Sequence, residues 1–318
     1  MKRLTVLATL FGVTFASVSC VPDALFGVSS SRSFSRGSAV HSIVVGSLTR
    51  AYVLHVPARR PVSKTGTALP YALLLVLHGS SATGADMEQV TSMDTLAEVN
   101  RWIVAYPNGE RGEGGLFPTD WNAGSCCGAA ARENIDDVAF VKAVISEIGG
   151  KLPVDKQRIY VAGFSDGGRM AHRLACVMAA QIAAIAVVSG SMKDEHCVPT
   201  KPVPLIAVHG TGDPTVPYDE ESLTPPPRQV TGVGALLPPS VQFWLAVDGC
   251  TTGTSATYSA AVTRTSFAGC TGAEVAFYSI ANGVHTWPVL DKTASGDPDA
   301  QLPASRVIVE FLARQVRR

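Results

Sequence analysis

The chain has 318 residues, and its composition, 46% hydrophobic and 16% charged, excludes a disordered protein. Lys and Arg together number 26, as do Asp and Glu, so no global field favours nucleic acid or acidic lipid as a partner. The 29 glycines and 20 prolines indicate a compact fold rich in loops, and the length suffices for one large core.

The N-terminal residues predict an export signal. Lys2 and Arg3 precede an apolar stretch, Leu4 to Phe15, and small residues follow from Ala16 to Ser19. The apolar stretch is too short to span a bilayer comfortably. We therefore expect a secreted or periplasmic protein in which residues 1–19 are a signal peptide, residues 20–40 a Ser-rich tether and residues 41–318 a single domain.

Seven cysteines leave one over after pairing. Cys20 directly follows the small residues, at the position where a bacterial lipoprotein carries its lipid, so this residue carries either a lipid anchor or a stray thiol. The remaining cysteines are an even set, which in an exported protein suggests disulfides: Cys126, Cys127, Cys176, Cys197, Cys250 and Cys270. No C-x-x-C pair occurs, so we expect no metal site.

The rest of the chain alternates between strand and helix patterns. We expect strands at 41–46, 50–57, 71–79, 101–107, 158–164, 183–190, 203–210 and 274–280. We expect helices at 87–99, from about 134 to 148, and at 167–179, 240–247 and 305–315. This alternation predicts an α/β fold, a mostly parallel sheet with helices on both faces. Segments 214–239 and 251–273 are expected to be loop-like insertions that form walls of a cleft.

The segment Arg158–Met170 contains a G-x-S-x-G motif centred on Ser165. An apolar strand precedes it and a helix pattern follows, which is the setting of a nucleophile elbow. Gly163 and Gly167 would let the backbone pack closely through a strained turn that lifts the hydroxyl above the sheet. Ser165 is therefore the candidate nucleophile.

A serine nucleophile needs a histidine base and a carboxylate that orients it, in the chain order Ser, Asp, His. Asp213 follows the strand expected at 203–210, and His285 follows the strand at 274–280. Both would lie at the carboxyl edge of the sheet, where ligands bind in open α/β folds. Taken alone, Asp213 could simply be a turn residue and His285 a buried structural histidine. The three residues in the required order, however, predict a catalytic triad.

A developing oxyanion needs two backbone N–H groups directed at it. We expect one from Asp166, directly after the nucleophile, and one from Ser80, in the segment LHGSS. His78 and His209, each in a His-Gly pair, are expected to pack beneath their loops.

Several motifs together resemble the exported poly(3-hydroxybutyrate) depolymerase and feruloyl esterase group of α/β-hydrolases. They are LHGSS, DWNAGSCCG, NIDDVAFV, GFSDGGRMAHRLAC, HGTGDPTVPY, FWLAVDGC and GVHTWP, and the resemblance covers about residues 45–316. It implies an α/β-hydrolase fold with Ser165 as nucleophile, His285 as base and then acid, and Asp213 as the orienting carboxylate. Ser-Ser-Ala-Thr after His78-Gly79 departs from the group, as does Arg169.

The stretch WNAGSCCGAA contains a second candidate nucleophile, Cys126, because Gly124, Cys126 and Gly128 fit G-x-C-x-G. No strand precedes this motif and no helix pattern follows it, which argues against a cysteine nucleophile. Across a trans peptide, adjacent Cα atoms lie about 3.8 Å apart, less than the roughly 4.4 Å or more usual in a disulfide. We therefore expect Cys126 and Cys127 to pair outward, in either combination, with Cys176 and Cys197, and Cys250 to pair with Cys270.

Three further residues are candidate substrate contacts: Trp287, Trp121 and Arg169. Each tryptophan could form an apolar wall or simply pack in the core. Arg169 could hold a carboxylate beside the elbow or be a solvated helix residue.

The sequence thus predicts an exported serine hydrolase that cleaves carboxylic esters through an acyl-enzyme, without cofactor or metal. Polyesters of hydroxy acids are the first substrate class and hydroxycinnamoyl (feruloyl) esters the second. A third alternative is an endo-amidase of an acidic polymer such as poly(aspartic acid). A surface binding protein on an inactive hydrolase fold is the alternative from another class, and the complete triad argues against it.

Overall fold

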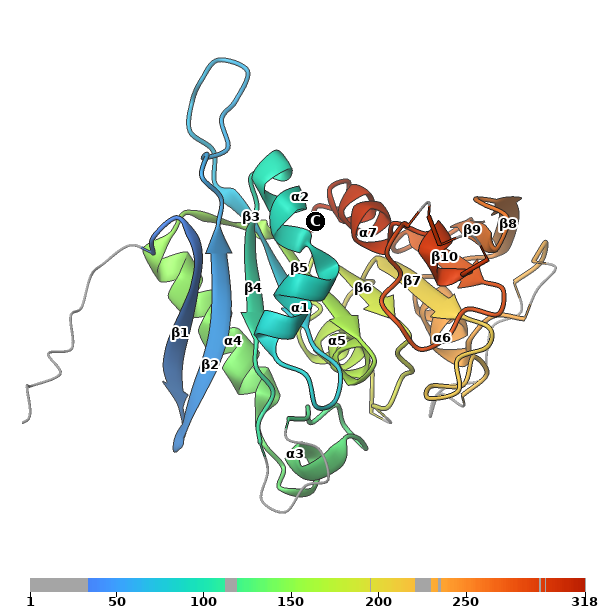
Figure 1. The fold of residues 1–318 in the computed structure, drawn as a ribbon, viewed down its shortest axis with the longest axis horizontal. Coiled ribbons are helices and arrows are strands. Elements are labelled where there is room, and N and C mark those ends of the chain that lie inside the picture. Colours follow the sequence, from blue (N-terminus) through green and yellow to red (C-terminus); the bar gives the residue numbers. More distant parts are fainter. Residues whose placement is uncertain are drawn as a thin grey trace, which may run out of the picture. The chain divides into compact units, whose positions relative to one another are not determined.

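The computed structural model describes residues 34–111, 119–194, 196–220, 230–233, 236–291, 293–294 and 296–317. Its strands form one sheet in the order β1-β2-β4-β3-β5-β6-β7-β10-β9-β8 (Figure 1). The strands are β1 Gly37–Val45, β2 Leu48–Val56, β3 Tyr71–Leu77, β4 Ile103–Pro107, β5 Val154–Phe164, β6 Ala184–Val188, β7 Leu205–Gly210, β8 Thr252–Thr257, β9 Val262–Ala268 and β10 Val275–Ile280. The central strands from β4 to β10 pair in parallel, and antiparallel pairs lie on either side of them.

Helices cover both faces of this sheet. They are α1 Gly84–Thr91, α2 Met93–Asn100, α3 Gly128–Arg132, α4 Asp137–Lys151, α5 Asp166–Val177, α6 Pro239–Val247 and α7 Ala304–Leu312. Side chains alternate along the fully buried strand β3, so that Leu73 and Leu75 pack in one core with residues of α4, α5 and α6. Leu74 and Val76 pack in a second core with residues of α1, α2 and α7. The two faces explain why β3 is a continuous apolar run.

Two helix predictions needed correction. The helix expected at 87–99 is two helices, α1 and α2, separated by Ser92, whose φ of 50° interrupts the helical backbone. A capping box between Thr83 and Asp86 begins α1 earlier than expected. The helix expected from about 134 begins at Asp137, because the Asp136 side chain accepts a hydrogen bond from the Ala139 amide and caps the helix there.

The segment 251–273 is not a loop-like insertion but the hairpin β8–β9, which extends the sheet beyond β10. The hairpin was not predicted because its strands are polar and rich in Thr and Ser. Most of β8 is exposed, and the residues of β8 do not alternate between apolar and polar. The other expected insertion, 214–239, lies partly outside the described residues.

The folded unit begins earlier than residue 41. Strand β1 starts at Gly37, inside the expected tether 20–40, because its small residues pair with the end of β2. The expected signal peptide and Cys20 lie outside the described residues. Among the helices that the structure describes, none is long and apolar enough to cross a membrane.

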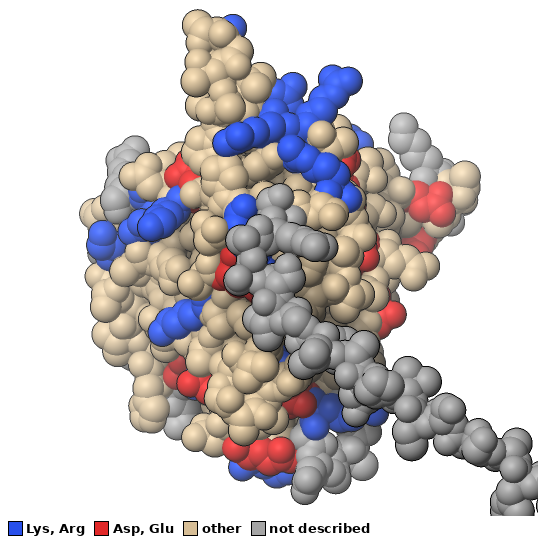
Figure 2. Space-filling view, turned by 90° about the vertical axis from the view of Figure 1, so that its left-hand side faces the viewer, with Lys and Arg blue, Asp and Glu red and all other residues tan. Residues whose placement is uncertain are grey.

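Charged side chains of both signs occur on the face drawn in Figure 2, separated by large uncharged areas, and the basic ones gather toward the top of that view. This distribution accords with the equal numbers of basic and acidic residues in the chain.

Candidate active site

Ser165 lies at the sharp turn between β5 and α5. Its φ of 54° and ψ of −120° lie outside the regions that most residues occupy, so the backbone is strained there. A Cβ added to Gly163 would overlap the backbone of Gly167, and a Cβ added to Gly167 would overlap the Leu77 carbonyl oxygen. The two glycines are therefore required by sterics, and the G-x-S-x-G motif forms the predicted elbow.

Ser165, His285 and Asp213 form a continuous hydrogen-bonded chain. The Oγ atom of Ser165 lies 2.9 Å from Nε2 of His285, and Nδ1 of His285 lies 2.8 Å from Oδ2 of Asp213. One tautomer satisfies both contacts, with the proton on Nδ1 donated to the carboxylate and Nε2 accepting from the serine hydroxyl. Ser165 is only 7% exposed, and the Asp213 side chain is fully buried. The geometry suits proton transfer from the hydroxyl to the ring.

The topology of the sheet brings His285 and Asp213 together. Strands β7 and β10 are adjacent and parallel, so the loops after them emerge side by side at the carboxyl edge. The amide of Gly212 donates to the Gly283 carbonyl at 3.0 Å, which joins the two loops. The Asp299 carboxylate accepts from the Val284 amide at 2.9 Å and anchors the histidine loop.

The environment of Asp213 keeps its carboxylate ionised. Burial by itself would raise the pKa, but hydrogen bonds from His209 and His285 and from the amides of Val216 and Thr215 hold the pKa of Asp213 well below its usual range. The contact from His209 Nε2 to Asp213 Oδ2 measures 3.4 Å. His209 was expected only to pack beneath its loop, and its contact with the acid has no local signal in the sequence.

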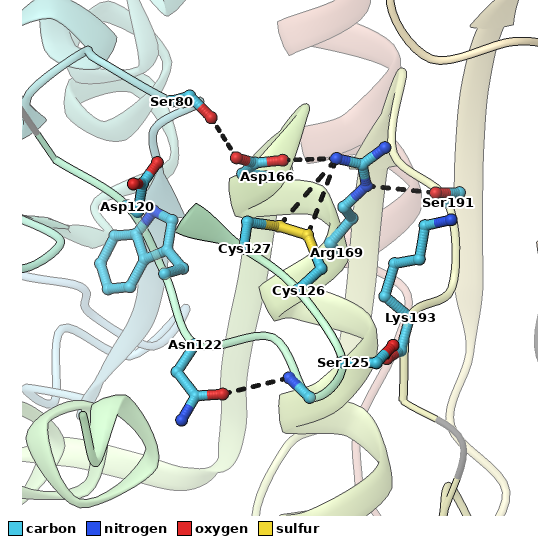
Figure 3. Close-up of a disulfide and its surroundings, with 12 residues drawn as sticks. Ser80, Asp120, Asn122, Ser125, Cys126, Cys127, Asp166, Arg169, Ser191 and Lys193 are labelled. Atoms are coloured by element: carbon cyan, nitrogen blue, oxygen red, sulfur yellow. Dashed lines mark hydrogen bonds and ion pairs between the residues drawn. A yellow bond between two sulfur atoms is a disulfide. The ribbon is translucent and has the colours of Figure 1, made fainter. Parts of the chain in front are cut away.

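Ser80 and Asp166, the expected oxyanion-hole residues, lie next to each other: Asp166 directly follows Ser165, and Ser80 belongs to the loop after β3. The Ser80 hydroxyl donates to the Asp166 carboxylate (Figure 3). Gly79 packs closely against the elbow, because a Cβ there would lie 3.1 Å from the Ser165 Cβ. This link holds the backbone segments of Ser80 and Asp166 together next to Ser165.

His78 packs beneath this loop, as expected. Its Nε2 accepts from the Gly109 amide at 2.7 Å and its Nδ1 donates to the Gly79 carbonyl at 2.7 Å. Burial lowers the pKa of His78 to about 4, so the ring is neutral and supports the loop that carries Ser80.

Arg169 does not offer a free cation to an anionic substrate. Its guanidinium lies 2.6 Å from Asp166 and donates to the Ser191 hydroxyl at 3.2 Å (Figure 3). It also lies 3.0 Å from Glu220. The side chain is 13% exposed. Two carboxylates therefore already neutralise its charge, and the expected role in holding substrate carboxylates needs correction.

The two tryptophans expected beside the substrate are buried in the two cores. Trp121 has no exposed surface, and its indole donates to the His78 carbonyl at 2.9 Å. Trp287 is 3% exposed and donates to the Ser305 hydroxyl at 3.0 Å. Neither ring presents a wall to a bound substrate, because each already packs against protein on all sides.

The disulfides differ from the expected pairing in one respect. Cys126 bonds to its neighbour Cys127, and Cys176 bonds to Cys197, so the outward pairing was wrong. The expectation assumed a trans peptide, whereas the Cys126–Cys127 peptide is cis and its Cα atoms lie 3.0 Å apart. The predicted bond between Cys250 and Cys270 is present and joins the two ends of the β8–β9 hairpin.

The rival cysteine nucleophile is not available in this structure, because Cys126 is in the disulfide. A short helix, α3, does follow the motif, contrary to the sequence prediction, but no strand of the described residues precedes it directly. The G-x-C-x-G motif is thus not an elbow.

His55, Glu88 and Asp94 form a cluster with the residue types that bind metal ions, with ligand atoms within 4.8 Å of one another. The Asp94 carboxylate already accepts from the Tyr106 hydroxyl at 2.6 Å and the Ser38 hydroxyl at 3.0 Å, and it lies 3.2 Å from His55. This cluster is a hydrogen-bond network that joins β2 to the helices α1 and α2, and its polar atoms already have partners within the protein.

Comparison with known proteins places the chain in a family. Residues 50–216 match the family described as esterase PHB depolymerase. The protein "Putative esterase NocK" of Nocardia uniformis subsp. tsuyamanensis is 30% identical over 86% of this chain and 82% of its own length. Feruloyl esterase C of Emericella nidulans is 31% identical over a region that covers 54% of this chain and 57% of that relative. The chain covers 33% of feruloyl esterase B of Piromyces equi, with 33% identity.

Solved structures agree with the fold. Acetyl xylan esterase from Aspergillus awamori superposes with a TM-score of 0.56 at 15% identity, over 86% of this chain and 99% of that one. This likeness concerns the fold alone and confirms the predicted α/β-hydrolase architecture. With the family match over more than half of its length, the chain belongs to the esterase PHB depolymerase family and is a carboxylic ester hydrolase.

Proposed function

We propose that this esterase is a serine hydrolase in which Ser165 is the nucleophile, His285 the general base and then acid, and Asp213 the orienting carboxylate. The hydrogen-bonded chain from Ser165 through His285 to Asp213 is the observation that carries the proposal. Ser165 Oγ attacks the ester carbonyl carbon while His285 Nε2 takes the hydroxyl proton. The low pKa of Asp213 leaves a carboxylate that stabilises the resulting imidazolium.

The backbone N–H groups of Ser80 and Asp166 would bind the oxyanion that forms on the carbonyl oxygen. Collapse of the tetrahedral intermediate expels the alcohol, which takes the proton from His285, and leaves an acyl-enzyme on Ser165. His285 then removes a proton from a water molecule, and the resulting hydroxide attacks the acyl carbon. The bond from this carbon to Ser165 Oγ breaks, the acid is released, and His285 returns the proton to Oγ. Support for this assignment comes from the link between the Ser80 hydroxyl and the Asp166 carboxylate, which ties both donor segments together.

Polyesters of hydroxy acids are the substrate class that we place first. The family description refers to PHB depolymerase. In addition, apolar side chains are exposed on the loop that carries His285: Val284 is 51% exposed and Val289 55%, and Leu290 is also exposed. An insoluble polyester would gain apolar contact with these side chains close to the nucleophile.

Hydroxycinnamoyl esters are the second candidate, because several relatives are named feruloyl esterases. Cleavage of poly(aspartic acid) loses its main support, since Arg169 is engaged by Asp166 and Glu220. Export is proposed from the N-terminal pattern of residues 1–19, and the three disulfides of the described residues favour an oxidising compartment. A lipid on Cys20 remains part of that proposal.

The test is a substrate panel with the purified chain: a short p-nitrophenyl ester, a polyhydroxybutyrate suspension, methyl ferulate and polyaspartate. We expect hydrolysis of the first two, and a loss of at least about 10⁴-fold in Ser165→Ala. Ser42→Ala, an exposed serine of β1, is the matched control and should keep full activity. Undiminished hydrolysis by Ser165→Ala would refute the assigned nucleophile, and ferulate release without polyester cleavage would favour the second substrate class.

A further inference from the structure

Basic and acidic side chains are separated along the chain, although their totals are equal. Between Asp23 and Asp86 the sequence contains no acidic residue, and its basic residues there are Arg32, Arg36, Arg50, Arg59, Arg60 and Lys64. Figure 2 keeps the vertical direction of Figure 1 and shows basic side chains gathered toward the top. The parallel strands begin at that edge of the sheet, which we call the amino edge. It comprises residues 34–37, 56–71, 100–103, 151–158, 273–275 and 312–317.

The connection between β2 and β3, residues 57–70, projects from the amino edge at the top of Figure 1. Hydrogen bonds hold it as a hairpin. The amide of Leu69 donates to the Pro61 carbonyl at 2.9 Å, and the amide of Ser63 donates to the Thr67 carbonyl at 2.8 Å. The projecting segment therefore presents its side chains from a hydrogen-bonded backbone.

The side chains of this hairpin are of two kinds. Arg59, Arg60 and Lys64 are exposed, and none of them forms an ion pair within the part of the chain that the structure describes. Val62 is 46% exposed and Leu69 38%. Segments of peripheral proteins that combine cations with exposed apolar side chains bind the surface of an anionic bilayer, because charge attraction adds to apolar burial.

The rest of the amino edge is also basic. Arg101 ends α2 just before β4, and Nη2 of Arg317 lies 3.4 Å from the carbonyl oxygen of the exposed Lys156. Acidic residues of this edge are engaged by basic ones: Glu147 by Lys151, Asp155 by Arg158 and Glu274 by Arg314. Glu98 lies 3.1 Å from His55. The edge therefore keeps an excess of positive charge.

The opposite edge of the sheet, where the parallel strands end, is rich in carboxylates. They follow β7 and β10 and belong to Asp213, Asp219, Glu220, Asp291, Asp297 and Asp299. This carboxyl edge also carries the proposed active site. An anionic surface attracts the amino edge and repels the carboxyl edge, so the separation of charge would orient the molecule.

The N-terminal part of the chain joins the fold at the same amino edge. Gly37, the first residue of β1, pairs with Val56, the last residue of β2. Cys20, the proposed lipid position, precedes Phe34 by 14 positions and lies outside the described residues. A chain of that length spans at most about 50 Å. A lipid at Cys20 would therefore tether the molecule to a bilayer by its basic edge.

We propose that the amino edge is a docking surface for a bilayer that contains anionic phospholipids, and that residues 57–70 enter its headgroup layer. Arg59, Arg60 and Lys64 bind lipid phosphates, while Val62 and Leu69 contact the acyl chains beneath them. The carboxyl edge then faces away from the bilayer and leaves the active site open to substrate. This last consequence rests on the proposed function, but the docking itself does not.

The experiment measures sedimentation of the full chain with vesicles of phosphatidylcholine, with and without phosphatidylglycerol. Every protein carries Cys20→Ala, so that no covalent lipid contributes. We expect a partition coefficient at least about tenfold higher for the anionic vesicles, and a fall at high salt. Arg59→Gln/Arg60→Gln/Lys64→Gln should lower the anionic partition coefficient by at least about tenfold.

The matched control removes three exposed positive charges elsewhere on the molecule: Arg111→Gln/Arg132→Gln/Arg306→Gln. It should bind anionic vesicles as the wild type does. Equal binding by the two triple variants would overturn the proposal, as would equal binding to both kinds of vesicle. Binding of dextran sulfate without binding of anionic vesicles would assign an acidic polymer in place of a bilayer. Circular dichroism verifies that each variant is folded.

The orientation is tested with a polarity-sensitive fluorophore on the thiol introduced by Val62→Cys or by Val289→Cys, which is exposed on the carboxyl edge. Anionic vesicles should shift the emission to the blue at position 62 only. A shift at position 289 would refute the orientation. Bound protein should still hydrolyse a p-nitrophenyl ester. Loss of hydrolysis with the shift confined to position 62 would support docking and contradict the open active site, and Ser165→Ala should dock normally while inactive.

Discussion

The Nε2 atom of His285 lies 2.9 Å from Oγ of Ser165, although 120 positions of the chain separate the two residues. Ser165 belongs to the turn between β5 and α5, and His285 to the loop after β10. Two further strands, β6 and β7, lie between β5 and β10 in the sheet. The contact therefore depends on the length and conformation of the histidine loop, which must reach back across the carboxyl edge.

Asp213→Asn should lower kcat for a p-nitrophenyl ester by about 10³–10⁴-fold with little change in KM. The amide would offer an N–H to Nδ1 of His285, so the ring would present the wrong tautomer to Ser165. The measurement is steady-state kinetics with both variants. Asp219→Asn, an exposed neighbour on the same loop, is the control and should match the wild type. Equal rates in Asp213→Asn and wild type would contradict the triad.

Gly163→Ala should destabilise the chain by about 1–3 kcal/mol and abolish activity, because the new Cβ would overlap the Gly167 backbone. The matched control is Gly149→Ala in α4, where an added Cβ meets nothing within 4 Å. That change should increase the free energy of unfolding by about 0.5–1 kcal/mol, since alanine loses less backbone entropy in a helix. Denaturant unfolding measures both. A Gly163→Ala variant as stable and active as the wild type would show that the elbow tolerates a Cβ.

Asp248→Asn should stabilise the protein at alkaline pH. Asp248 is fully buried, and this burial raises its pKa to about 8 against the opposing effect of a hydrogen bond from the Val203 backbone. The folded state thus holds this proton more tightly than the unfolded chain, whose Asp pKa is about 3.9. The free energy of unfolding should therefore fall as the pH rises from about 4 to about 8, and the variant removes that loss.

Unfolding at pH 5 and pH 8 tests this sign. We expect the stability advantage of Asp248→Asn over the wild type to grow by roughly 4 kcal/mol between pH 5 and pH 8. Asp155→Asn is the opposite case. Burial would raise the pKa of Asp155, but hydrogen bonds from Gln157 and Arg158 and the Arg158 charge lower it, so that variant should lose slight stability at pH 8. A difference between Asp248→Asn and wild type that does not vary with pH would rule out the titration.

Arg50→Met should destabilise the chain by about 3–5 kcal/mol, because it leaves the buried Asp137 carboxylate without its cation. The Arg50 guanidinium lies 2.7 Å from Asp137, and both side chains are almost fully buried. Arg158→Met, which breaks a partly exposed pair with Asp155, should cost less than about 1 kcal/mol. Chemical denaturation compares the two, and similar losses would show that burial does not determine the strength of these pairs.

Local patterns were sufficient for much of this fold and site. The continuous apolar run at β3 and the strand–turn–helix pattern around Ser165 depend on neighbouring residues alone, and both predictions agree with the structure. The positions of Asp213 and His285 after β7 and β10 could also be predicted, because parallel strands end at the same edge. The β8–β9 hairpin was missed, since its exposed strands are stabilised by pairing with β10 and carry no apolar alternation of their own.

The partners of side chains that lie far apart along the chain could not be predicted from the sequence. A count of cysteines predicts disulfides, but only the folded chain places Cys176 beside Cys197 and leaves Cys126 to Cys127. The sequence alone places Arg169 beside the elbow, since it lies four residues after Ser165. Its ion pair with Glu220, 51 residues away, depends on tertiary structure. Periodicity records which face of an element is apolar; it contains no distances between elements, and those distances determine pairing, charge neutralisation and the reach of His285 to Ser165.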